Sequence, residues 1–235
     1  MPYFNIVAET SENTVVTEYE PVKKRSDSYQ SEAQLEQEFI RLLCEQGYEY
    51  LPIHTEKDLI ENLRMKLSEL NDYQFSDTEW ENFFKNAIAN PNEHIVEKTR
   101  KIQEDNIQVL TRDDGSSKNI TLIDKKNIHN NRLQVINQYA VSTDDGAKHD
   151  NRYDVTVLVN GLPLVHIELK RRGVAIREAF NQINRYQRES FGAGSGLYEY
   201  IQIFVISNGT NTKYYSNSTR CNAEKENEKK GSSKT

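Results

Sequence analysis

Apolar residues recur every three or four positions through much of the first hundred residues, which is the spacing of one face of a helix. Ser31 and Gln34 have the spacing of a capping box, in which each side chain accepts a hydrogen bond from the other residue's backbone N–H. Gly47 is placed to end the helix that follows. The apolar positions of this predicted helix are Leu35, Phe39, Leu42 and Leu43.

Three further helices are predicted before residue 105. Residues 57–69 repeat the apolar spacing. Ser76 and Glu79 form a second capping box ahead of an aromatic segment, and Pro91 would end that helix because proline has no backbone N–H to donate. Residues 92–104 are predicted to form the last of the three.

The pattern changes near residue 118 to short segments rich in Val, Ile and Tyr, which is typical of strands. A predicted helix at about 175–189 lies between the fourth and the fifth of them. This order predicts an α/β fold with a mixed β-sheet flanked by helices and an extra N-terminal helical layer. The predicted strands are residues 118–124, 132–141, 153–159, 164–170 and 200–206.

Both ends of the chain lack this regularity. Residues 1–25 predict an N-terminal arm, irregular or with a short edge strand. The hydrophilic residues 218–235 predict a disordered tail or the cut edge of a longer protein. One domain is therefore expected at 26–217. The 235 residues, 36% of them hydrophobic, are enough for such a domain to bury a core without disulfides or metal.

Cysteine content and the lack of long apolar runs predict a protein of a reducing compartment. Cys44 and Cys221 form no disulfide framework, and Cys44 is expected to be packed in its helix. The N-terminus has neither the basic region nor the apolar run of a signal peptide, and other apolar runs are too short to span a membrane. A cytoplasmic protein without a membrane partner is predicted.

Charge is unevenly spread. The net charge of −6 would by itself argue against binding nucleic acid. Residues 151–235, however, contain 13 Lys and Arg against 8 Asp and Glu, a net charge of +5, which leaves −11 for residues 1–150. The acidic part is expected to face solvent or protein partners, and the basic part holds the candidate chemistry.

The segment RYDVTVLVNGLPLVHIELK, residues 152–170, carries that chemistry. Asp154 begins one predicted strand, and Glu168 and Lys170 end the next, two residues apart and so on one face. Two converging carboxylates suit Mg²⁺, for which Mn²⁺ can substitute, and a lysine there could orient a water or stabilise charge on a phosphate. Glu and Lys also alternate on ordinary half-exposed strands. Because an unpaired Glu168 would be costly to bury in so apolar a segment, phosphodiester hydrolysis is the hypothesis.

This hypothesis places a condition on the hairpin. If Asn160 and Gly161 formed a plain two-residue turn, Asp154 would lie opposite Ile167 and face away from Glu168. A bulge or an odd-length loop is needed, such as a three-residue loop with Gly161 in the left-handed conformation. A strict two-residue turn without a bulge would contradict the site.

Polar side chains on the predicted helix 175–189 would complete the site. Gln182, Arg185 and Tyr186 are spaced to lie on one face, where they could bind a phosphate or a metal-bound water. The window 168–190 has a net charge of +3 and could form a basic rim for DNA phosphates. A solvated, normally charged helix is the alternative. The other arginines assigned to DNA binding are Arg171, Arg172 and Arg188.

These segments resemble the N-terminal nuclease domain of the restriction (R, motor) subunit of type I restriction-modification enzymes, in the PD-(D/E)xK, RecB-like nuclease superfamily. The resemblance covers roughly residues 26–216. It rests on Asp154, an ExK motif 14 residues later, and a QxxxY motif in the next helix. The stretches that carry it are RYDVTVLVNGLPLVHIELK, GVAIREAFNQINRYQRESF, IQIFVISNGT, SYQSEAQLEQEFI and LIDKKN.

The resemblance implies a PD-(D/E)xK, restriction-endonuclease-like core with five catalytic residues, the first two of which bind the metal. These residues are Asp154, Glu168, Lys170, Gln182 and Tyr186.

Three other residues bear on this assignment. Tyr153 stands where the motif's name has proline. Glu36 is either the helix carboxylate that some relatives bring near the metal or a solvated glutamate. His166 shares the face of Glu168 and either enters the site or packs as a strand histidine.

The resemblance further implies an Mg²⁺-dependent type I site-specific deoxyribonuclease that cuts duplex DNA during restriction of foreign DNA. The modification and specificity subunits would be its partners through the full-length R subunit, and only that subunit would need ATP. The terminal GSSKT lacks the glycine that a P-loop has before its lysine, so we expect no ATP site here and a fragment or truncated product without a motor. The alternatives are a non-catalytic docking or regulatory module of the same complex, and a DNA-repair nuclease with the same core.

Overall fold

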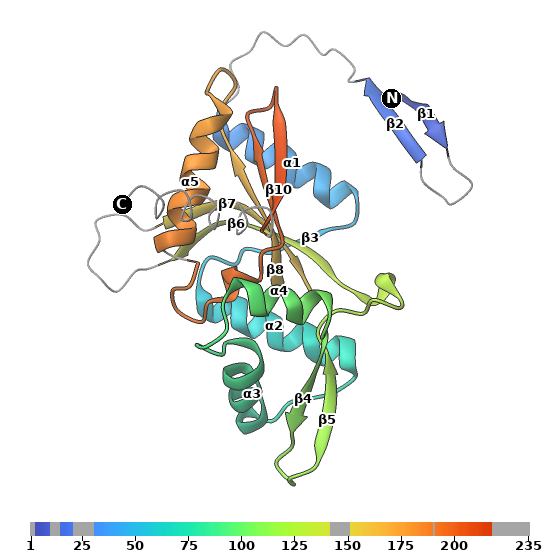
Figure 1. The fold of residues 1–235 in the computed structure, drawn as a ribbon, viewed down its shortest axis with the longest axis vertical. Helices are drawn as coiled ribbons and strands as arrows, with labels where there is room; N and C mark the ends of the chain where they lie inside the picture. Colours follow the sequence, from blue (N-terminus) through green and yellow to red (C-terminus); the bar gives the residue numbers. More distant parts are fainter. Residues whose placement is uncertain (1–2, 10–14, 21–30, 142–150, 190, 218–235) are drawn as a thin grey trace, which may run out of the picture.

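The centre of the molecule is a six-stranded mixed sheet in the order β10-β9-β8-β7-β6-β3 (Figure 1). β6, β7 and β8 are antiparallel neighbours, as are β9 and β10, whereas β8 pairs with β9 and β6 with β3 in parallel. The strands are β3 (Glu49–Tyr50), β6 (Leu133–Val141), β7 (Asn151–Val159), β8 (Leu162–Leu169), β9 (Ile203–Ser207) and β10 (Thr212–Ser216). The computed structural model describes residues 3–9, 15–20, 31–141, 151–189 and 191–217.

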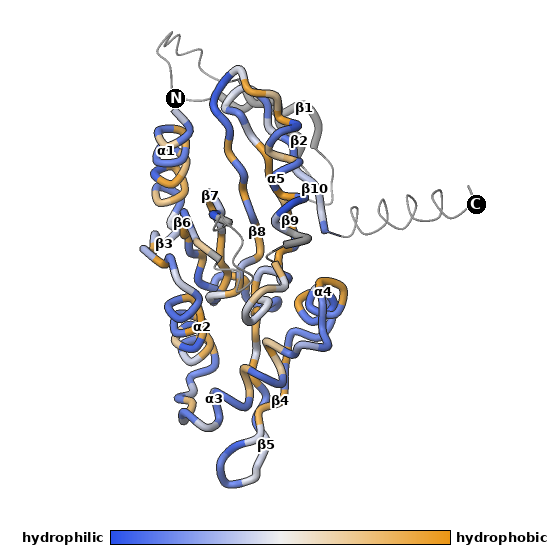
Figure 2. Tube along the Cα trace, turned by 90° about the vertical axis from the view of Figure 1, so that its left-hand side faces the viewer, coloured by the Kyte–Doolittle hydropathy of each residue, from blue (hydrophilic) through white to orange (hydrophobic). Residues whose placement is uncertain are grey.

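Helices cover both faces of this sheet, which confirms the predicted mixed sheet flanked by helices (Figure 2). α1 (Glu32–Glu45) packs on one face, and α5 (Ile176–Glu189) packs on the other. Parallel strands need a crossover, and the one that joins β8 to β9 contains α5. The helix with the polar motif therefore lies against the strand with the acidic one. The packing side chains are Leu35, Phe39 and Leu43 of α1 and Ala179, Ile183 and Tyr186 of α5.

A second group of elements forms the lower half of the molecule in Figure 1. Leu59, Leu63 and Leu67 of its longest helix are completely buried and belong to the same core as α5. The elements are α2 (Glu56–Asn71), α3 (Asp77–Phe83), a π-helical turn (Phe84–Ile88), α4 (Ile95–Gln103), β4 (Ile107–Thr111), β5 (Ser117–Thr121) and two 3₁₀ turns (Ile128–Asn130 and Leu197–Tyr200).

The helix starts predicted at Ser31 and Ser76 are confirmed. Ser31 and Ser76 are N-caps, and both capping boxes form, with Gln34 and Glu79 as their partners. The third helix ends ahead of Pro91, as expected. Local hydrogen bonding thus fixed these boundaries, and local sequence was enough to find them.

The packing expected for Cys44 is wrong, because that residue is exposed. Leu42 is also 41% exposed. Both lie outside the stripe of α1 that faces the sheet, since a helix on one face of a sheet buries only part of its circumference.

The sequence did not predict β3, β4 or β10. β3 has two residues, and most side chains of β4 and β10 are at least partly exposed, so none of these strands has a strong hydrophobic signal. Where an arm was expected, β1 (Tyr3–Glu9) and β2 (Val15–Glu20) pair as a separate antiparallel sheet. The predicted tail, 218–235, lies outside the described residues.

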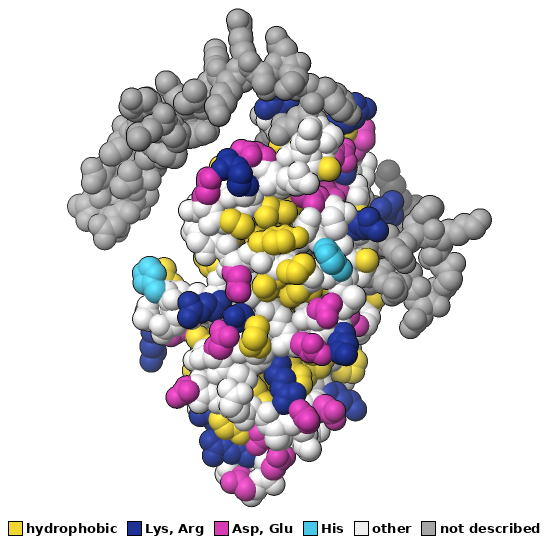
Figure 3. Space-filling view, turned by 180° about the vertical axis from the view of Figure 1, so that it is seen from behind, with side chains coloured by type: hydrophobic (Ala, Val, Ile, Leu, Met, Phe, Trp, Pro, Cys, Tyr) yellow, Lys and Arg dark blue, Asp and Glu magenta, His cyan; other side chains and the backbone are white. Residues whose placement is uncertain are grey.

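Charged side chains of both signs are interspersed on the face opposite to the view of Figure 1, and apolar side chains gather in its middle (Figure 3). The acidic excess of the first 150 residues therefore does not form one acidic patch on this face. In the described ranges, every helix is too short or too polar to cross a membrane.

Candidate active site

The β7–β8 hairpin combines a tight turn with a bulge. Asn160 and Gly161 both have positive φ, 51° and 84°, the backbone of a two-residue type I′ turn. A Cβ at Gly161 would lie 2.6 Å from the backbone of Leu63, so close approach as well as φ requires glycine. The ladder then shifts by one residue at Leu164, which has no partner in β7. Of the two devices expected, the bulge is present and the three-residue loop is not.

This bulge sets the register that the candidate site needs. Val155 lies opposite Ile167, so continuing the ladder by one residue sets Asp154 level with Glu168. Asp154 Oδ2 accepts a hydrogen bond of 2.9 Å from the backbone N–H of Leu169, which holds its carboxylate against β8. The two carboxylates that the sequence paired are therefore neighbours in the structure.

Burial and like charge both act on this pair. Glu168 is completely buried. Burial, and then the neighbouring charge of Glu168, raise the pKa of Asp154 to about 7, although the Leu169 N–H and Lys170 oppose the shift. The ionised form of Asp154 is thus disfavoured by burial and by the second carboxylate, and a bound cation would stabilise it.

Lys170 is the cation that the chain itself supplies. Its Nζ donates to Glu168 Oε1 at 3.0 Å and to the carbonyl of Leu169 at 3.1 Å. Burial lowers the pKa of Lys170, but Glu168 and Asp154 outweigh that effect and the net pKa is raised, so the amine is protonated at neutral pH. The ammonium group thus hydrogen-bonds to Glu168 and attracts Asp154 through its charge.

The donor set fits a divalent cation that prefers oxygen ligands. Glu168 Oε2 is buried and has no hydrogen-bond partner among the described residues. No group of three or more His, Cys, Asp or Glu side chains is arranged to hold a metal in that part of the chain. Mg²⁺ commonly binds one or two protein carboxylates and keeps several waters, so the pair of Asp154 and Glu168 is sufficient for it.

Glu36 of α1 lies beside the pair. It is buried, so the expectation of a solvated glutamate is wrong. Its carboxylate accepts hydrogen bonds from Asn137 Nδ2 at 2.5 Å and Gln138 Nε2 at 2.6 Å, and its charge adds to the raised pKa of Asp154. The two amides were not singled out from the sequence, although two adjacent polar residues inside the apolar strand β6 were a signal. Gln138 also has a positive φ of 52°.

Gln182 and Tyr186 meet across one turn of α5, as their spacing predicted. Gln182 Nε2 donates to the Tyr186 hydroxyl, which in turn donates to the carbonyl of Arg152 at 2.7 Å. Burial, and then the charge of Glu168, raise the pKa of Tyr186 to about 12, so its hydroxyl is protonated at neutral pH. The Arg152 carbonyl, a backbone group, gave no side-chain signal in the sequence.

Three of the four arginines assigned to DNA binding are exposed. Arg171 and Arg172 follow Lys170 in the turn after β8, and the Arg185 guanidinium lies over the Tyr186 ring, 5.3 Å from its centroid. The side chain of Arg188 lies outside the described residues.

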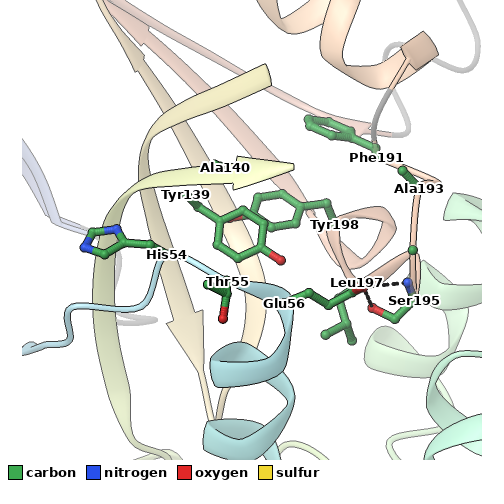
Figure 4. Close-up of a pocket in the computed structure, with 11 residues that line it drawn as sticks. His54, Thr55, Glu56, Tyr139, Ala140, Phe191, Ala193, Ser195, Leu197 and Tyr198 are labelled. Atoms are coloured by element: carbon green, nitrogen blue, oxygen red, sulfur yellow. Dashed lines mark hydrogen bonds between the residues drawn. The ribbon is translucent and has the colours of Figure 1, made fainter. Parts of the chain in front are cut away.

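The loop after α5 is hydrogen-bonded to α2 beside a cavity of about 300 Å³ (Figure 4). Glu56 accepts hydrogen bonds from the backbone N–H and the hydroxyl of Ser195, both at 2.6 Å. Tyr139 and Tyr198 stack across the cavity wall with ring centroids 5.0 Å apart. A Cβ at Gly194 would collide with the Glu56 carboxylate. This contact was not foreseen from the sequence, because its partners are 139 residues apart.

Over residues 29–223 the sequence matches the family described as Type I restriction enzyme R protein N terminus. The chain belongs to this family. It is 49% identical over 215 residues to the Type I restriction enzyme EcoprrI endonuclease subunit of Escherichia coli, covering 91% of this chain and 67% of that relative. It is 42% identical over 194 residues to the SsaAORF53P endonuclease subunit of Staphylococcus saprophyticus, covering 80% of this chain and 20% of that relative.

A more distant relative is the HindI endonuclease subunit of Haemophilus influenzae, 30% identical over 201 residues, which cover 76% of this chain and 18% of that protein. Membership of the R-protein family confirms the resemblance inferred from the acidic and QxxxY motifs and places the chain among type I restriction endonucleases. The chain spans 67% of one of these relatives and about a fifth of the others.

Proposed function

We propose that the corner formed by β7, β8 and α5 hydrolyses phosphodiester bonds of duplex DNA, as the endonuclease centre of a type I restriction enzyme R subunit. The observation that carries this proposal is the meeting of Asp154, Glu168 and Lys170, two carboxylates with one ammonium group. The names of the relatives, which are endonuclease subunits of type I restriction enzymes, support it.

Asp154 and Glu168 would hold Mg²⁺ or Mn²⁺, which when bound polarises a phosphate and lowers the pKa of a water. Both carboxylates must be ionised for this, so binding displaces the proton that Asp154 partly retains near neutral pH. Lys170 is protonated and anchored on Glu168. Its ammonium would orient the attacking water or stabilise the charge that develops on the phosphate.

The side chains of α5 and of the β8–α5 turn would hold the DNA strand. The paired Gln182 and Tyr186 would place a phosphate or its water, in keeping with their position next to the carboxylates. The exposed Arg171, Arg172 and Arg185 would bind flanking phosphates, because DNA affinity comes largely from its backbone charges.

Other activities would belong to a longer R subunit. We propose that this subunit binds the modification and specificity subunits, and that ATP is used by parts outside this chain. We also propose residues 26–217 as the nuclease domain, flanked by the arm at 1–25 and the tail at 218–235.

Two measurements on the 235-residue chain test the proposal. Calorimetric titration with Mn²⁺ is expected to show one binding site that Asp154→Asn abolishes. Nicking of a supercoiled plasmid in Mg²⁺ or Mn²⁺ is expected to fall by about 100-fold or more in Lys170→Ala. Glu81→Gln, which changes an exposed carboxylate on α3, is the matched control and should alter neither.

Plasmid nicking that survives both Asp154→Asn and Lys170→Ala would show that this assignment is wrong. A chain that binds no Mn²⁺ through Asp154 and Glu168 would support the docking module instead. Membership of the restriction family favours restriction over a DNA-repair role.

A further inference from the structure

His166 is a completely buried histidine on β8, two residues before Glu168. Its ring packs edge-to-face against Tyr153, Tyr186 and Phe191, with centroids 5.3, 6.1 and 6.0 Å away. These ring contacts explain why a flat aromatic side chain packs at this position. They provide no hydrogen bond to either ring nitrogen.

Neither nitrogen of His166 has a hydrogen-bond partner among the described residues. An imidazole always has at least one N–H, and burying such a donor unpaired costs about 1–3 kcal/mol. A packing role alone would be met by phenylalanine without that cost. The ring nitrogens therefore call for a polar explanation.

The polar atom that faces the His166 ring is Oε2 of Glu168. Nε2 lies 3.5 Å from Glu168 Oε2, slightly beyond good hydrogen-bond length, and that oxygen has no hydrogen-bond partner of its own in the described part of the chain. The other oxygen, Oε1, is held by Lys170. An unsatisfied donor and an unsatisfied acceptor thus face one another beside the aromatic rings that pack on His166.

We propose that His166 is a positioning residue, whose Nε2–H donates to Glu168 Oε2 and fixes the plane of that carboxylate. The terminal torsion of a glutamate is broad, so one donor on one oxygen leaves the group free to rotate. With Lys170 on Oε1 and His166 on Oε2, the Glu168 carboxylate would be held in one orientation next to Asp154, ready to bind a cation with it. This inference rests on the metal site of the proposed function and adds a second-layer residue to it.

Calorimetric Mn²⁺ titration of the full chain separates positioning from packing. His166→Phe keeps the aromatic packing but removes the donor, and it is expected to weaken Mn²⁺ binding about 10- to 100-fold. His166→Gln restores an N–H donor and should recover most of that affinity. Tyr198→Phe is the matched control, because it removes a buried hydroxyl contact with Thr156 in the same aromatic cluster without touching Glu168. It should leave Mn²⁺ affinity unchanged.

A second measurement needs no variant and so does not depend on folding of His166→Phe. Long-range ¹H–¹⁵N spectra of the wild-type chain should show the Nε2–H tautomer of His166, with a shift of that resonance when Mg²⁺ is added. An Nδ1–H tautomer, or wild-type Mn²⁺ affinity in His166→Phe, would overturn the inference. If wild type binds Mn²⁺ through Asp154 while His166→Phe is unaffected, only the positioning role fails. If wild type binds no Mn²⁺, the proposed function fails with it.

Discussion

Two buried charge clusters in this chain differ in their balance of positive and negative charge. In the first, Lys98 is 2% exposed and its Nζ donates to Glu199 Oε2 and to the Gly196 carbonyl, both at 2.8 Å. One ammonium group contacts one carboxylate, and the Gly196 carbonyl accepts a second hydrogen bond from that ammonium. In the second, Asp154 and Glu168 share the single ammonium of Lys170, and one carboxylate oxygen is left without a hydrogen bond among the described residues.

This difference distinguishes a cluster with a structural role from one with a candidate chemical role. A buried ion pair that is balanced and fully hydrogen-bonded can persist simply because breaking it would strand a charge. A cluster with surplus negative charge destabilises the fold that contains it, which makes it a candidate functional site. Charge balance, more than burial, distinguishes the candidate active site from the cluster at Lys98.

The largest expected effect is in the balanced cluster. Lys98→Met should lower the free energy of unfolding by about 3–5 kcal/mol, because it removes the buried ammonium from the Glu199 carboxylate and one of the two hydrogen bonds to the Gly196 carbonyl. Urea unfolding followed by circular dichroism measures this change. Lys57→Met, at an exposed i,i+4 pair with Glu61, is the control and should cost less than about 1 kcal/mol. Equal costs for the two variants would remove the contrast.

An opposite sign is expected in the unbalanced cluster. Asp154 has a pKa of about 7 when folded, against about 3.9 in an unfolded chain. The folded state therefore binds the proton more tightly, and stability falls as pH rises from about 4 to 7. Asp154→Asn removes this penalty and should raise the free energy of unfolding of the metal-free chain by about 4 kcal/mol at pH 8.

The same substitution should have a much smaller effect at pH 4, where Asp154 is protonated in the folded state and about half protonated in the unfolded chain. Unfolding curves in EDTA at the two pH values make the comparison. Adding Mg²⁺ should stabilise wild type and leave Asp154→Asn unchanged, since the variant lacks the ligand. A variant that is less stable than wild type at pH 8 would mean that the carboxylates do not repel one another as the structure implies.

The smallest effect concerns neutral groups at the same site. Tyr186→Phe removes the hydroxyl that donates to the Arg152 carbonyl and should cost about 1 kcal/mol in urea unfolding. Tyr50→Phe removes a hydrogen bond from a half-exposed hydroxyl to Asn137 and should cost less than half of that. A cost for Tyr186→Phe as large as that for Lys98→Met would show that hydrogen bonds, and not charge balance, dominate the energetics of this corner.

Local signals explain most of what the sequence predicted. The capping boxes at Ser31 and Ser76 are contacts between residues three apart, so their spacing alone revealed them. The carboxylates Asp154 and Glu168 are joined by one hairpin, and the requirement that they meet was enough to predict a bulge. The family resemblance added roles to these residues, which spacing alone does not give.

The contacts that were missed connect residues far apart in the chain. Glu36 meets Asn137 and Gln138 across about a hundred residues, and Glu56 meets Ser195 across 139. Nothing in a local window encodes such a contact, because it depends on how α1 and α2 are placed on the sheet. Exposed strands such as β10 were missed for a different reason, since a half-polar edge strand has no periodic apolar face.

The bulge at Leu164 has a consequence for how distant sequences are compared. It absorbs one residue of the β7–β8 hairpin, so a chain one residue shorter, with a regular ladder and the same two-residue turn, would set the same two carboxylates side by side. The interval of 14 residues between Asp154 and Glu168 therefore records how this hairpin accommodates its length, and it is not itself required by the chemistry. A search pattern that fixes the interval would discard sequences whose folded hairpins are equivalent.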